Sequence, residues 1–428
     1  MKRLISCVLA LLYIMAGFAS GTWILHGKEY RVDTLYHAYI GPGTTQTSIK
    51  LAGPVNLRVF YTTTDLKNEN VDVRAIKHKD TLTGLGTVSN AAESHSTSNR
   101  SYFAGINADF FSSSMPCGIT VVDGEVYCSD QASGWSLFGI DANKIPYSGG
   151  GDFYVKLTAP DYSTAELSAM NLERETNGLV LYSSRKGANT GTDGNGSEVV
   201  LIPDGEGNFL TPGATVRMRV QGNPNHAGSM PIPDNGYILS GSGTKESFVS
   251  NLSEGDEVEV RCAIRFNGFT GGKIQQALGG CPMLVSGGKV LDTENALDHL
   301  TSAQPRTAVG YNAEKNKLVM LVADGRSSIS VGPISKVLAD IMIYAGCSEA
   351  MNFDGGGSST FYVKGEGVIN QPSDGSERSV TDGLYLSTDA PQNDMTITTI
   401  RFMDYAKTLN QGDAYTPVIY GYNQYGVL

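Results

Sequence analysis

The sequence is poor in positive charge. Its 428 residues contain 32 Lys and Arg against 43 Asp and Glu, which gives a formal net charge of −11, and no long basic run occurs. A chain of this charge has no general attraction for a phosphate backbone, so nucleic acid is excluded as an expected partner. Histidine is also scarce, at 6 residues, and no ligand cluster with metal spacing is visible. We predict no metal and no other cofactor, although paired carboxylates can also hold a divalent cation.

Long apolar runs are absent after the first 22 residues, where no stretch reaches the roughly 18 apolar residues of a membrane helix. Residues 1–22 have the pattern of a secretory signal peptide. Lys2 and Arg3 precede the apolar run Leu4–Phe18, and small residues follow it. We therefore expect an exported protein, in the periplasm, at the cell surface or secreted, with no membrane span. The oligomeric state is not determined by the sequence.

Cysteine is present in small, odd number once the leader is removed. Five cysteines follow residue 22, so at least one thiol is free, and export permits disulfides. Cys117 and Cys128 flank GITVVDGEVY, a hairpin pattern with Asp123 and Gly124 at the turn. We predict a disulfide between these two cysteines. The pairing of the other three, Cys262, Cys281 and Cys347, stays open.

Glycine is abundant, at 51 residues, and accompanies many Thr, Val and Tyr. This composition favours short strands and many turns over long helices. We predict an α+β fold that is β-rich, with mixed and antiparallel sheets and few helices, among them 333–346 and 293–303. Residues 23–395 form the main domain, residues 158–260 form a Gly-rich β lobe within it, and residues 396–428 form a short C-terminal β segment.

The stretch MNFDGGGSST, residues 351–360, carries the strongest signal for a site. A carboxylate, Asp354, ends an apolar run, and three glycines, two serines and a threonine follow. Glycines let the backbone adopt positive φ, and successive amides in such a turn are able to hold an anion. A simple tight turn would rarely need all three glycines, because ordering them costs entropy. The predicted binding residues are Gly355, Gly356, Gly357, Ser358 and Ser359.

Two further segments place polar residues at strand ends. Residues 317–324 form a buried strand that ends in Asp324, and the helix before the Gly-rich stretch suggests a βαβ-like unit with Asp324 and Asp354 at chain turns. Residues 102–111 form an apolar strand that Asn107 and Asp109 interrupt. Buried polar groups of this kind are either paired or part of a site, and both interpretations remain open.

Six blocks in order resemble the phosphodiester glycosidase family, over residues 55–386. They are INADFF at 106–111, CPMLVSGGKV at 281–290, RTAVGY at 306–311, VADGRS at 322–327, NFDGGGSST at 352–360 and QPSDGSERSV at 371–380. The chain departs from the family at Asp109, where other members often carry Gly, and at Arg326, which some members replace. The lobe at 158–260 is not shared by the mammalian enzyme, and the substrate is therefore not carried over.

The resemblance implies a hydrolase that cleaves the bond between a sugar anomeric carbon and a phosphodiester phosphate, on a surface or extracellular glycan. Arginine forks match phosphate oxygens, and glycoside cleavage usually uses two carboxylates. The predicted catalytic residues are Asp324, Asp354 and Arg306. The predicted substrate-binding residues are Asn107, the five residues of the Gly-rich turn, Ser373, Asp374 and Arg378.

Two other classes of function fit the sequence. A non-catalytic polysaccharide-binding protein is compatible with the β lobe and the 21 tyrosines, and a metal-dependent phosphodiesterase is compatible with the clustered carboxylates. Release of free sugar rather than sugar phosphate, and insensitivity to a chelator, distinguish the glycosidase from the second class. The sugar and the anomeric outcome stay open.

Overall fold

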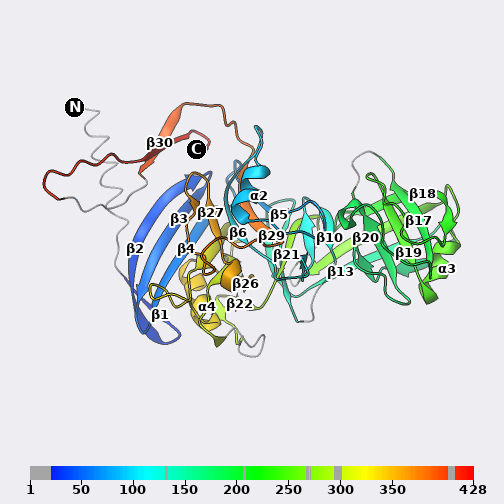
Figure 1. Cartoon of the computed structure of the whole chain (residues 1–428), viewed down its shortest axis with the longest axis horizontal. Coiled ribbons are helices and arrows are strands. Elements are labelled where there is room, and N and C mark those ends of the chain that lie inside the picture. Colours follow the sequence, from blue (N-terminus) through cyan, green and yellow to red (C-terminus); the bar gives the residue numbers. More distant parts are fainter. Residues whose placement is uncertain are drawn as a thin grey trace.

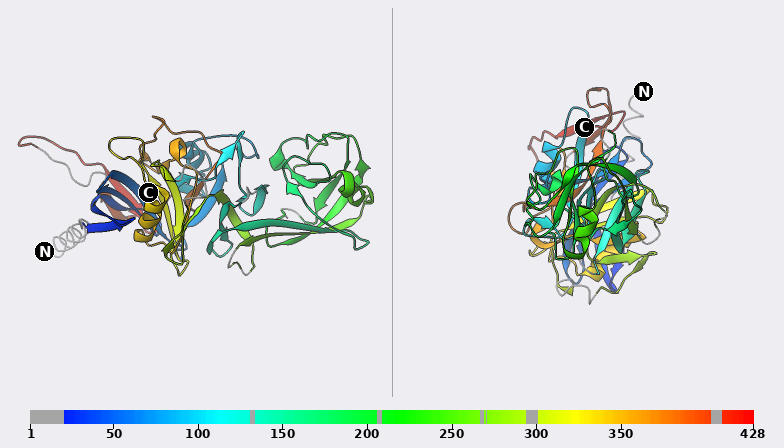
Figure 2. Two further views of the ribbon diagram at one scale, coloured as in Figure 1. Left: turned by 90° about the horizontal axis from the view of Figure 1, so that it is seen from below. Right: turned by 90° about the vertical axis from the view of Figure 1, so that its right-hand side faces the viewer.

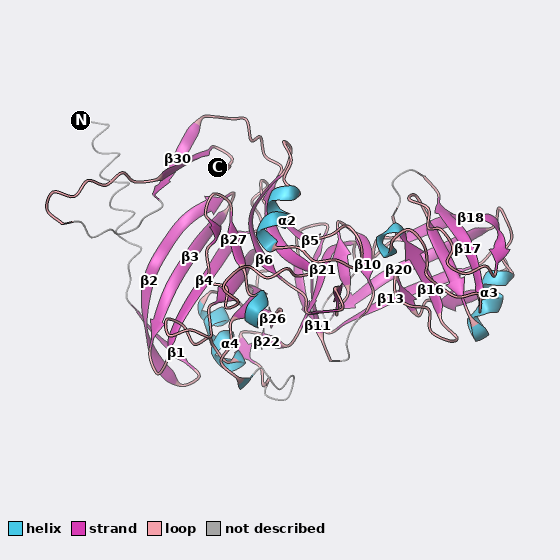
Figure 3. Ribbon diagram, in the orientation of Figure 1, coloured by secondary structure: helices cyan, strands magenta, loops and turns pink. Residues whose placement is uncertain are grey.

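The computed structural model describes residues 21–130, 134–205, 209–266, 269, 271–293, 301–402 and 410–428. The molecule is elongated, with the long blue strands of the N-terminal part at one end and the green strands at the other (Figures 1 and 2). Strands dominate (Figure 3), and the α-helices within the described residues are α2 (Val88–Ser94), α3 (Glu246–Ser250) and α4 (Ser335–Tyr344). The predicted β-rich α+β class is therefore confirmed.

A nine-stranded sheet forms one layer of the part that we call the body. Every neighbouring pair in it is antiparallel. In spatial order its strands are β1 (Gly21–Leu25), β2 (Lys28–Gly41), β3 (Thr44–Ala52), β4 (Asn56–Asp65), β25 (Lys317–Ala323), β24 (Arg306–Tyr311), β26 (Glu349–Asn352), β22 (Met283–Ser286) and β23 (Lys289–Val290).

A five-stranded antiparallel sheet forms the second layer of the body. Its strands, in spatial order, are β28 (Gly367–Val368), β27 (Phe361–Val363), β6 (Ser101–Asn107), β29 (Asp382–Thr388) and β5 (Asp72–Lys77). The two sheets pack face to face around an apolar core, to which the first contributes Val322 and Met351 and the second Ile106 and Leu384. This packing fixes the edges of the two sheets relative to each other.

Two of the helices, α2 and α4, cover the outer faces of the body. The predicted helix at 333–346 is α4, and its buried side chains Leu338 and Ile341 pack against Leu321 and Ala308 of the nine-stranded sheet. The chain enters α2 through Thr87, whose side chain accepts a hydrogen bond from the amide of Asn90. The predicted helix at 293–303 lies mostly outside the described residues.

A second five-stranded sheet connects the body to an eight-stranded sheet that we call the lobe. The connecting sheet consists of β10 (Glu125–Cys128), β9 (Thr120–Val122), β21 (Ile274–Gly280), β11 (Ser136–Asp141) and β12 (Pro146–Gly149). The lobe consists of β14 (Thr164–Glu166), β13 (Gly151–Thr158), β20 (Glu257–Phe266), β18 (Thr215–Asn225), β17 (Ser197–Pro203), β19 (Tyr237–Gly241), β16 (Leu179–Ser183) and β15 (Ala169–Met170). Because β15 and β16 are parallel and the other pairs antiparallel, this sheet is mixed.

Two short pairs complete the described chain: β7 (Phe111–Ser112) with β8 (Met115–Pro116), and β30 (Ile397–Phe402) with β31 (Ile419–Asn423). The C-terminal pair is anchored by buried Arg401, which bonds Glu366 at 2.7 Å. The predicted leader lies outside the described residues except for Gly21 and Thr22, which open β1. No helix in the described part of the chain is long and apolar enough to cross a membrane.

Candidate functional site

One edge of the nine-stranded sheet collects three of the predicted site residues. β24 is antiparallel to both neighbours, β25 and β26, so the start of β24 lies at the same edge as the ends of the other two strands. Arg306 opens β24, while Asp324 directly follows β25 and Asp354 lies two residues after β26. The chain from β25 through α4 to β26 joins two parallel strands, and β24 lies between them.

The five-stranded sheet of the body supplies the facing wall through Asn107, the last residue of β6. Its Nδ2 donates to the backbone carbonyl of Asp354 at 2.7 Å. Its Oδ1 accepts from Thr307 Oγ1 at 2.8 Å and from the amide of Thr360 at 3.1 Å. Because Asn107 is fully buried, it fixes the backbone on which Asp354 sits and joins the two sheets at this edge.

The Gly-rich turn leads from Asp354 into β27 through a 3-10 turn. The amides of Gly356, Ser358 and Ser359 donate to backbone carbonyls at 2.9, 3.2 and 3.3 Å. Much of the amide set that the sequence suggested for an anion is therefore used within the protein. Side chains around the turn, rather than its backbone alone, are the groups that face a ligand here.

Two arginines pack directly against the glycines. Gly356 has φ +62°, and a Cβ at this position would lie 3.0 Å from Arg326 Nη2. A Cβ at Gly357 would overlap the Arg378 guanidinium. The missing side chains of these glycines thus leave room for two guanidinium groups, one on each residue, as a site for an anion requires.

The loop at 371–380 holds the two exposed arginines in place. Arg378 donates from Nε and Nη2 to Asp374 Oδ2, at 2.8 and 2.6 Å, and from Nη1 to Ser358 Oγ at 3.3 Å. Arg326 Nη1 donates to Ser373 Oγ at 3.4 Å. Ser373 and Asp374, both predicted to bind substrate, therefore orient the arginines.

Arg306 lies below these groups, 2% exposed. Its Nε donates to the carbonyl of Pro333 at 3.3 Å and its Nη2 to that of Ser302 at 2.9 Å. Burial, together with the charge of Arg326, lowers the Arg306 pKa to about 10, still well above neutral pH. Arg306 thus adds positive charge beneath the turn.

The Asp354 carboxyl combines burial with partners of both signs. Burial, more than any other cause, raises its pKa to about 6, and the negative charge of Asp382 acts in the same direction. The Ser358 hydroxyl and the charge of Arg378 act in the opposite direction. A carboxyl that titrates near neutral pH is suited to accept a proton during a reaction.

Asp109 and Asp382 form a second, fully buried carboxyl pair behind Asp354. The amide of Asp109 donates to Asp382 Oδ1 at 2.9 Å. A Cβ at Gly118 or Gly279 would lie 2.7 or 2.6 Å from Asp109 Oδ2, so these glycines admit the carboxyl. Neither Asp109 oxygen has a hydrogen bond of ordinary geometry to a described residue, although the two glycine amides favour its charged form.

The titration of this pair follows from burial. Desolvation raises the pKa of Asp109, and the charge of Asp382 raises it further. Desolvation also raises the pKa of Asp382, whereas the charge of buried Lys77 lowers it. Lys77 Nζ donates to the carbonyls of Gly84 and Thr381, both at 3.2 Å. Burial thus favours the protonated forms of both carboxyls, and the charge of Asp382 raises the pKa of Asp354.

Asp324 lies apart from this cluster. Its side chain is 2% exposed, and its Oδ1 accepts from the Gln371 amide at 2.8 Å and from Asn370 Nδ2 at 3.4 Å. Burial raises its pKa, and Gln371, Arg58 and Asn370 lower it. The carboxyl thus holds the start of the loop that carries Ser373 and Arg378.

The structure therefore brings together most of the predicted residues and adds three. Asn107, Arg306, Asp354, the Gly-rich turn, Ser373, Asp374 and Arg378 converge at one edge, whereas the Asp324 carboxyl faces the supporting loop. Arg326, Asp109 and Asp382 join the site, although the sequence did not select them. The signal for Asp109 was its position inside an apolar strand, and Asp382, which follows the sixth block, had no comparable signal.

The predicted disulfide between Cys117 and Cys128 is wrong, since both are free thiols, as are Cys262, Cys281 and Cys347. In the pairing of β9 with β10, Cys128 lies opposite Thr120 rather than Cys117. The turn sets this register by pairing Val122 with Glu125, and a bulge between Val126 and Cys128 shifts it by one residue. Within the described ranges, no three or more His, Cys, Asp or Glu side chains are grouped so that they could hold a metal ion.

Comparison with known proteins covers the part of the chain that carries most of this site. Residues 212–387 match the family model described as phosphodiester glycosidase, which confirms the resemblance over that part of the chain. The SPbeta prophage-derived uncharacterized protein YomE of Bacillus subtilis (strain 168) is 40% identical over 88 residues, 21% of this chain and 13% of that protein. The match thus spans a small part of that relative's length.

Solved structures match this chain at low identity, and the first two below share its fold. A hypothetical protein from Synechocystis has a TM-score of 0.62 at 15% identity, with 81% of this chain and 62% of that chain covered. A putative exported protein from Burkholderia pseudomallei K96243 has a TM-score of 0.62 at 18% identity, with 86% and 98% covered. The zebrafish N-acetylglucosamine-1-phosphodiester α-N-acetylglucosaminidase catalytic domain, auto-inhibited by its pro-peptide, has a TM-score of 0.43 at 12% identity, with 83% and 87% covered.

Proposed function

We propose that this protein is an exported phosphodiester glycosidase. It hydrolyses the bond between a sugar anomeric carbon and the phosphate of a phosphodiester, on a surface or extracellular glycan. The observation that carries the proposal is the convergence of Arg306, Arg326 and Arg378 around a Gly-rich turn that begins at Asp354, whose pKa of about 6 suits it to proton transfer. The family match over residues 212–387 supports the same reaction class.

The arginines hold the phosphate. Arg326 and Arg378 lie against consecutive glycines, Gly356 and Gly357, so a diester phosphate above the turn is contacted from two sides. Guanidinium forks match phosphate oxygens in charge and geometry. The buried charge of Arg306 adds to the potential from below. As the bond to the sugar breaks, negative charge grows on the phosphate, and donors already in place lower the barrier.

Asp354 accepts the proton of the attacking water. The anomeric C–O bond breaks, the phosphate oxygen keeps the electron pair, and a water oxygen bonds to the anomeric carbon while its proton passes to Asp354. Asn107 is a positioning residue, because it holds the Asp354 carbonyl at 2.7 Å. The charge of Asp382 makes Asp354 a better proton acceptor by raising its pKa.

Asp324 acts through the loop rather than on the sugar. Its bond to the Gln371 amide at 2.8 Å fixes the segment that leads to Ser373, Asp374 and Arg378. We propose this supporting role in place of the direct role that the sequence suggested, because the residue is 2% exposed and its Oδ1 is bonded to the loop, while Oδ2 has no hydrogen-bond partner among the described residues.

Product analysis tests the proposal. The full-length protein is incubated with a panel of sugar 1-phosphodiesters, including teichoic-acid-like and capsule-like polymers, with and without a chelator. The expected products are free sugar and a phosphate that stays on the other half of the substrate. Sugar phosphate as product, with activity lost to the chelator, would establish a metal-dependent phosphodiesterase instead. Tight binding without turnover would establish a polysaccharide-binding protein.

A further inference from the structure

A wide hollow opens where the lobe leaves the connecting sheet. Its volume is about 820 Å³, within the roughly 300–1,000 Å³ of ligand-binding clefts. Trp135, directly before β11, lines it from the connecting sheet, and Asp152 and Phe153 line it from the start of β13. Asp130 and Arg265 also line the hollow. The site described above uses none of these five side chains.

The hollow adjoins the chain segment that carries Asp109 and Phe110. The ring of Trp135 meets that of Phe110 edge to face, with centroids 5.0 Å apart, and Phe110 directly follows Asp109. The Cys117 amide donates to the Phe110 carbonyl at 2.9 Å. The charges of Asp109, Asp130 and Asp354 all act on the Cys117 thiol. These contacts place Trp135 beside the segment that carries Asp109 and Phe110, on the side of the body that faces the lobe.

The lining has the chemistry of a neutral sugar site. Trp135 and Phe153 are both partly exposed, so each offers an apolar ring face to a sugar. Asp130, Asp152 and Arg265 are exposed, and their hydrogen-bonding groups accept from and donate to hydroxyls. Two carboxylates against one guanidinium leave a net negative lining, which disfavours a phosphate here. The positive groups at the Gly-rich turn and the negative groups here thus select different parts of one substrate.

We propose that this hollow binds a neutral saccharide segment of the substrate, so that the substrate is an oligosaccharide or polysaccharide lying across the body and the lobe. The inference rests on the proposed function for the placement of the phosphodiester. The assignment of the hollow as a saccharide site rests on its own lining of aromatic rings, carboxylates and a guanidinium.

Binding of neutral tetrasaccharides tests the hollow independently of turnover. Wild type, Trp135→Ala and Trp135→Phe are titrated calorimetrically with chitotetraose, cellotetraose and maltotetraose. At least one is expected to bind wild type, with affinity about tenfold weaker in Trp135→Ala and largely recovered in Trp135→Phe. Tyr162→Ala is the matched control, because this lobe aromatic is 87% exposed and does not line the hollow. Absence of binding, or equal affinity in Trp135→Ala, would overturn the proposal.

Turnover separates this inference from the proposed function. On a small probe, the p-nitrophenyl phosphodiester of N-acetylglucosamine 1-phosphate, Trp135→Ala is expected to keep kcat/KM within about twofold of wild type, because the probe does not reach the hollow. On the same sugar phosphate esterified to the tetrasaccharide that binds, KM is expected to rise with kcat unchanged. If wild type turns over neither substrate, the proposed function fails while the calorimetric result still decides the hollow.

Discussion

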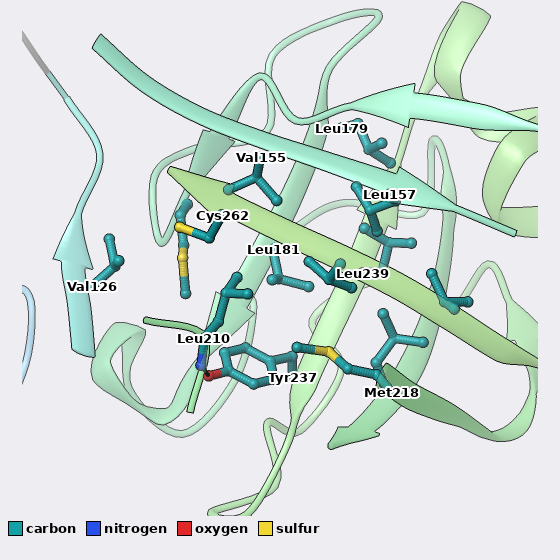
Figure 4. Close-up of a cluster of buried hydrophobic side chains, with 14 of the residues drawn as sticks. Val126, Val155, Leu157, Leu179, Leu181, Leu210, Met218, Tyr237, Leu239 and Cys262 are labelled. Atoms are coloured by element: carbon teal, nitrogen blue, oxygen red, sulfur yellow. Dashed lines mark hydrogen bonds between the residues drawn. The ribbon is translucent and has the colours of Figure 1, made fainter. Parts of the chain in front are cut away.

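The interior of the lobe is apolar, whereas the site edge of the body buries charged side chains. The lobe core is a continuous apolar cluster, in which Leu157, Leu181 and Leu239 are fully buried (Figure 4). Tyr237 is buried there too, with its hydroxyl accepting the Leu210 amide at 2.9 Å. At the site edge of the body, by contrast, Asp109, Asp382, Asp324 and Arg306 are all 2% exposed or less.

This difference shows where the fold gives up stability in order to bury charged groups. Burying apolar side chains stabilises a fold, whereas burying carboxyls costs free energy that their partners only partly recover. Raised pKa values at Asp109, Asp354 and Asp382 record that cost. Changes at the site edge should therefore remove activity and spare or improve stability, and changes in the lobe core should do the reverse.

Asp354→Asn should produce the largest effect. Turnover on a sugar 1-phosphodiester should fall by about a hundred- to thousandfold or more, by analogy with the loss of a preorganised transition-state group. Because Asp109 lies in the same cluster but behind the reacting groups, Asp109→Asn is the matched carboxyl-to-amide control and should lose less than about tenfold. Full turnover in well-folded Asp354→Asn, with circular dichroism unchanged, would rule out the assigned role.

The same Asp354→Asn variant should be more stable than wild type at about pH 8. Folding raises the Asp354 pKa from its ordinary 3.8 to about 6, so the folded state binds the proton more tightly. Wild-type stability from this group is greatest below 3.8 and falls as pH rises through about 6. Thermal unfolding of both proteins at about pH 4 and pH 8 measures this, and an equal gain at both would contradict it.

Leu239→Ala should reverse the pattern. Removing this buried lobe side chain should cost roughly 2–5 kcal/mol of unfolding free energy through lost transfer and a residual cavity. Turnover per folded molecule on a small phosphodiester should stay unchanged, since the residue lies in the lobe core. Urea unfolding and kinetics on one preparation measure both quantities. A large loss of turnover in the folded variant would break the division between lobe and site.

Arg378→Met and Arg326→Met should weaken turnover unequally. Arg378 bonds Ser358 and lowers the Asp354 pKa, so its loss should cost roughly a hundredfold. Arg326 packs against Gly356, and the charge that lowers the pKa of Asp354 is that of Arg378 rather than that of Arg326. The loss of Arg326 should therefore lower turnover by roughly tenfold. Kinetics on the small phosphodiester, with folding checked by circular dichroism, rank the two. The opposite order would move the phosphate toward Arg326.

The pH profile should shift in opposite directions in two variants. Wild-type kcat/KM should rise through a limb near the Asp354 pKa of about 6. Asp382→Asn removes a charge that raises this pKa and should move the limb to lower pH, whereas Ser358→Ala removes a hydrogen bond that lowers it and should move the limb up, each by as much as about one unit. A limb that stays fixed in both variants would assign the titration to another group.

The smallest expected effect is at the cysteines. Alkylation of the denatured protein without reductant should label both Cys117 and Cys128, because neither is bonded. Peptide mapping gives the answer directly. A disulfide-linked peptide containing both residues would show that the hairpin register differs from the one described here.

Much of the site was predictable because its signals are local. The carboxylate and three glycines at 354–357 predicted a turn that another group approaches closely. In the structure Gly356 has a positive φ, and arginines pack against both Gly356 and Gly357. The helix at α4 was predictable from apolar spacing. The disulfide prediction failed because the two-residue turn pairs Val122 with Glu125 and Val121 with Val126. This register places Cys128 opposite Thr120 and leaves Cys117 outside β9.

By itself, the sequence determined the β-rich class, the order of the blocks and the residue types at the Gly-rich turn, since each depends on neighbouring residues. Only the tertiary structure decided which buried carboxyls lie together at the site edge. Asp382 reaches Asp109 because β29 pairs with β6, and Asp324 bonds Gln371 because the loop at 371–380 begins beside the end of β25. Side-chain roles of this kind depend on contacts between segments tens to hundreds of residues apart, and the strand pairing that creates them is a property of the whole fold.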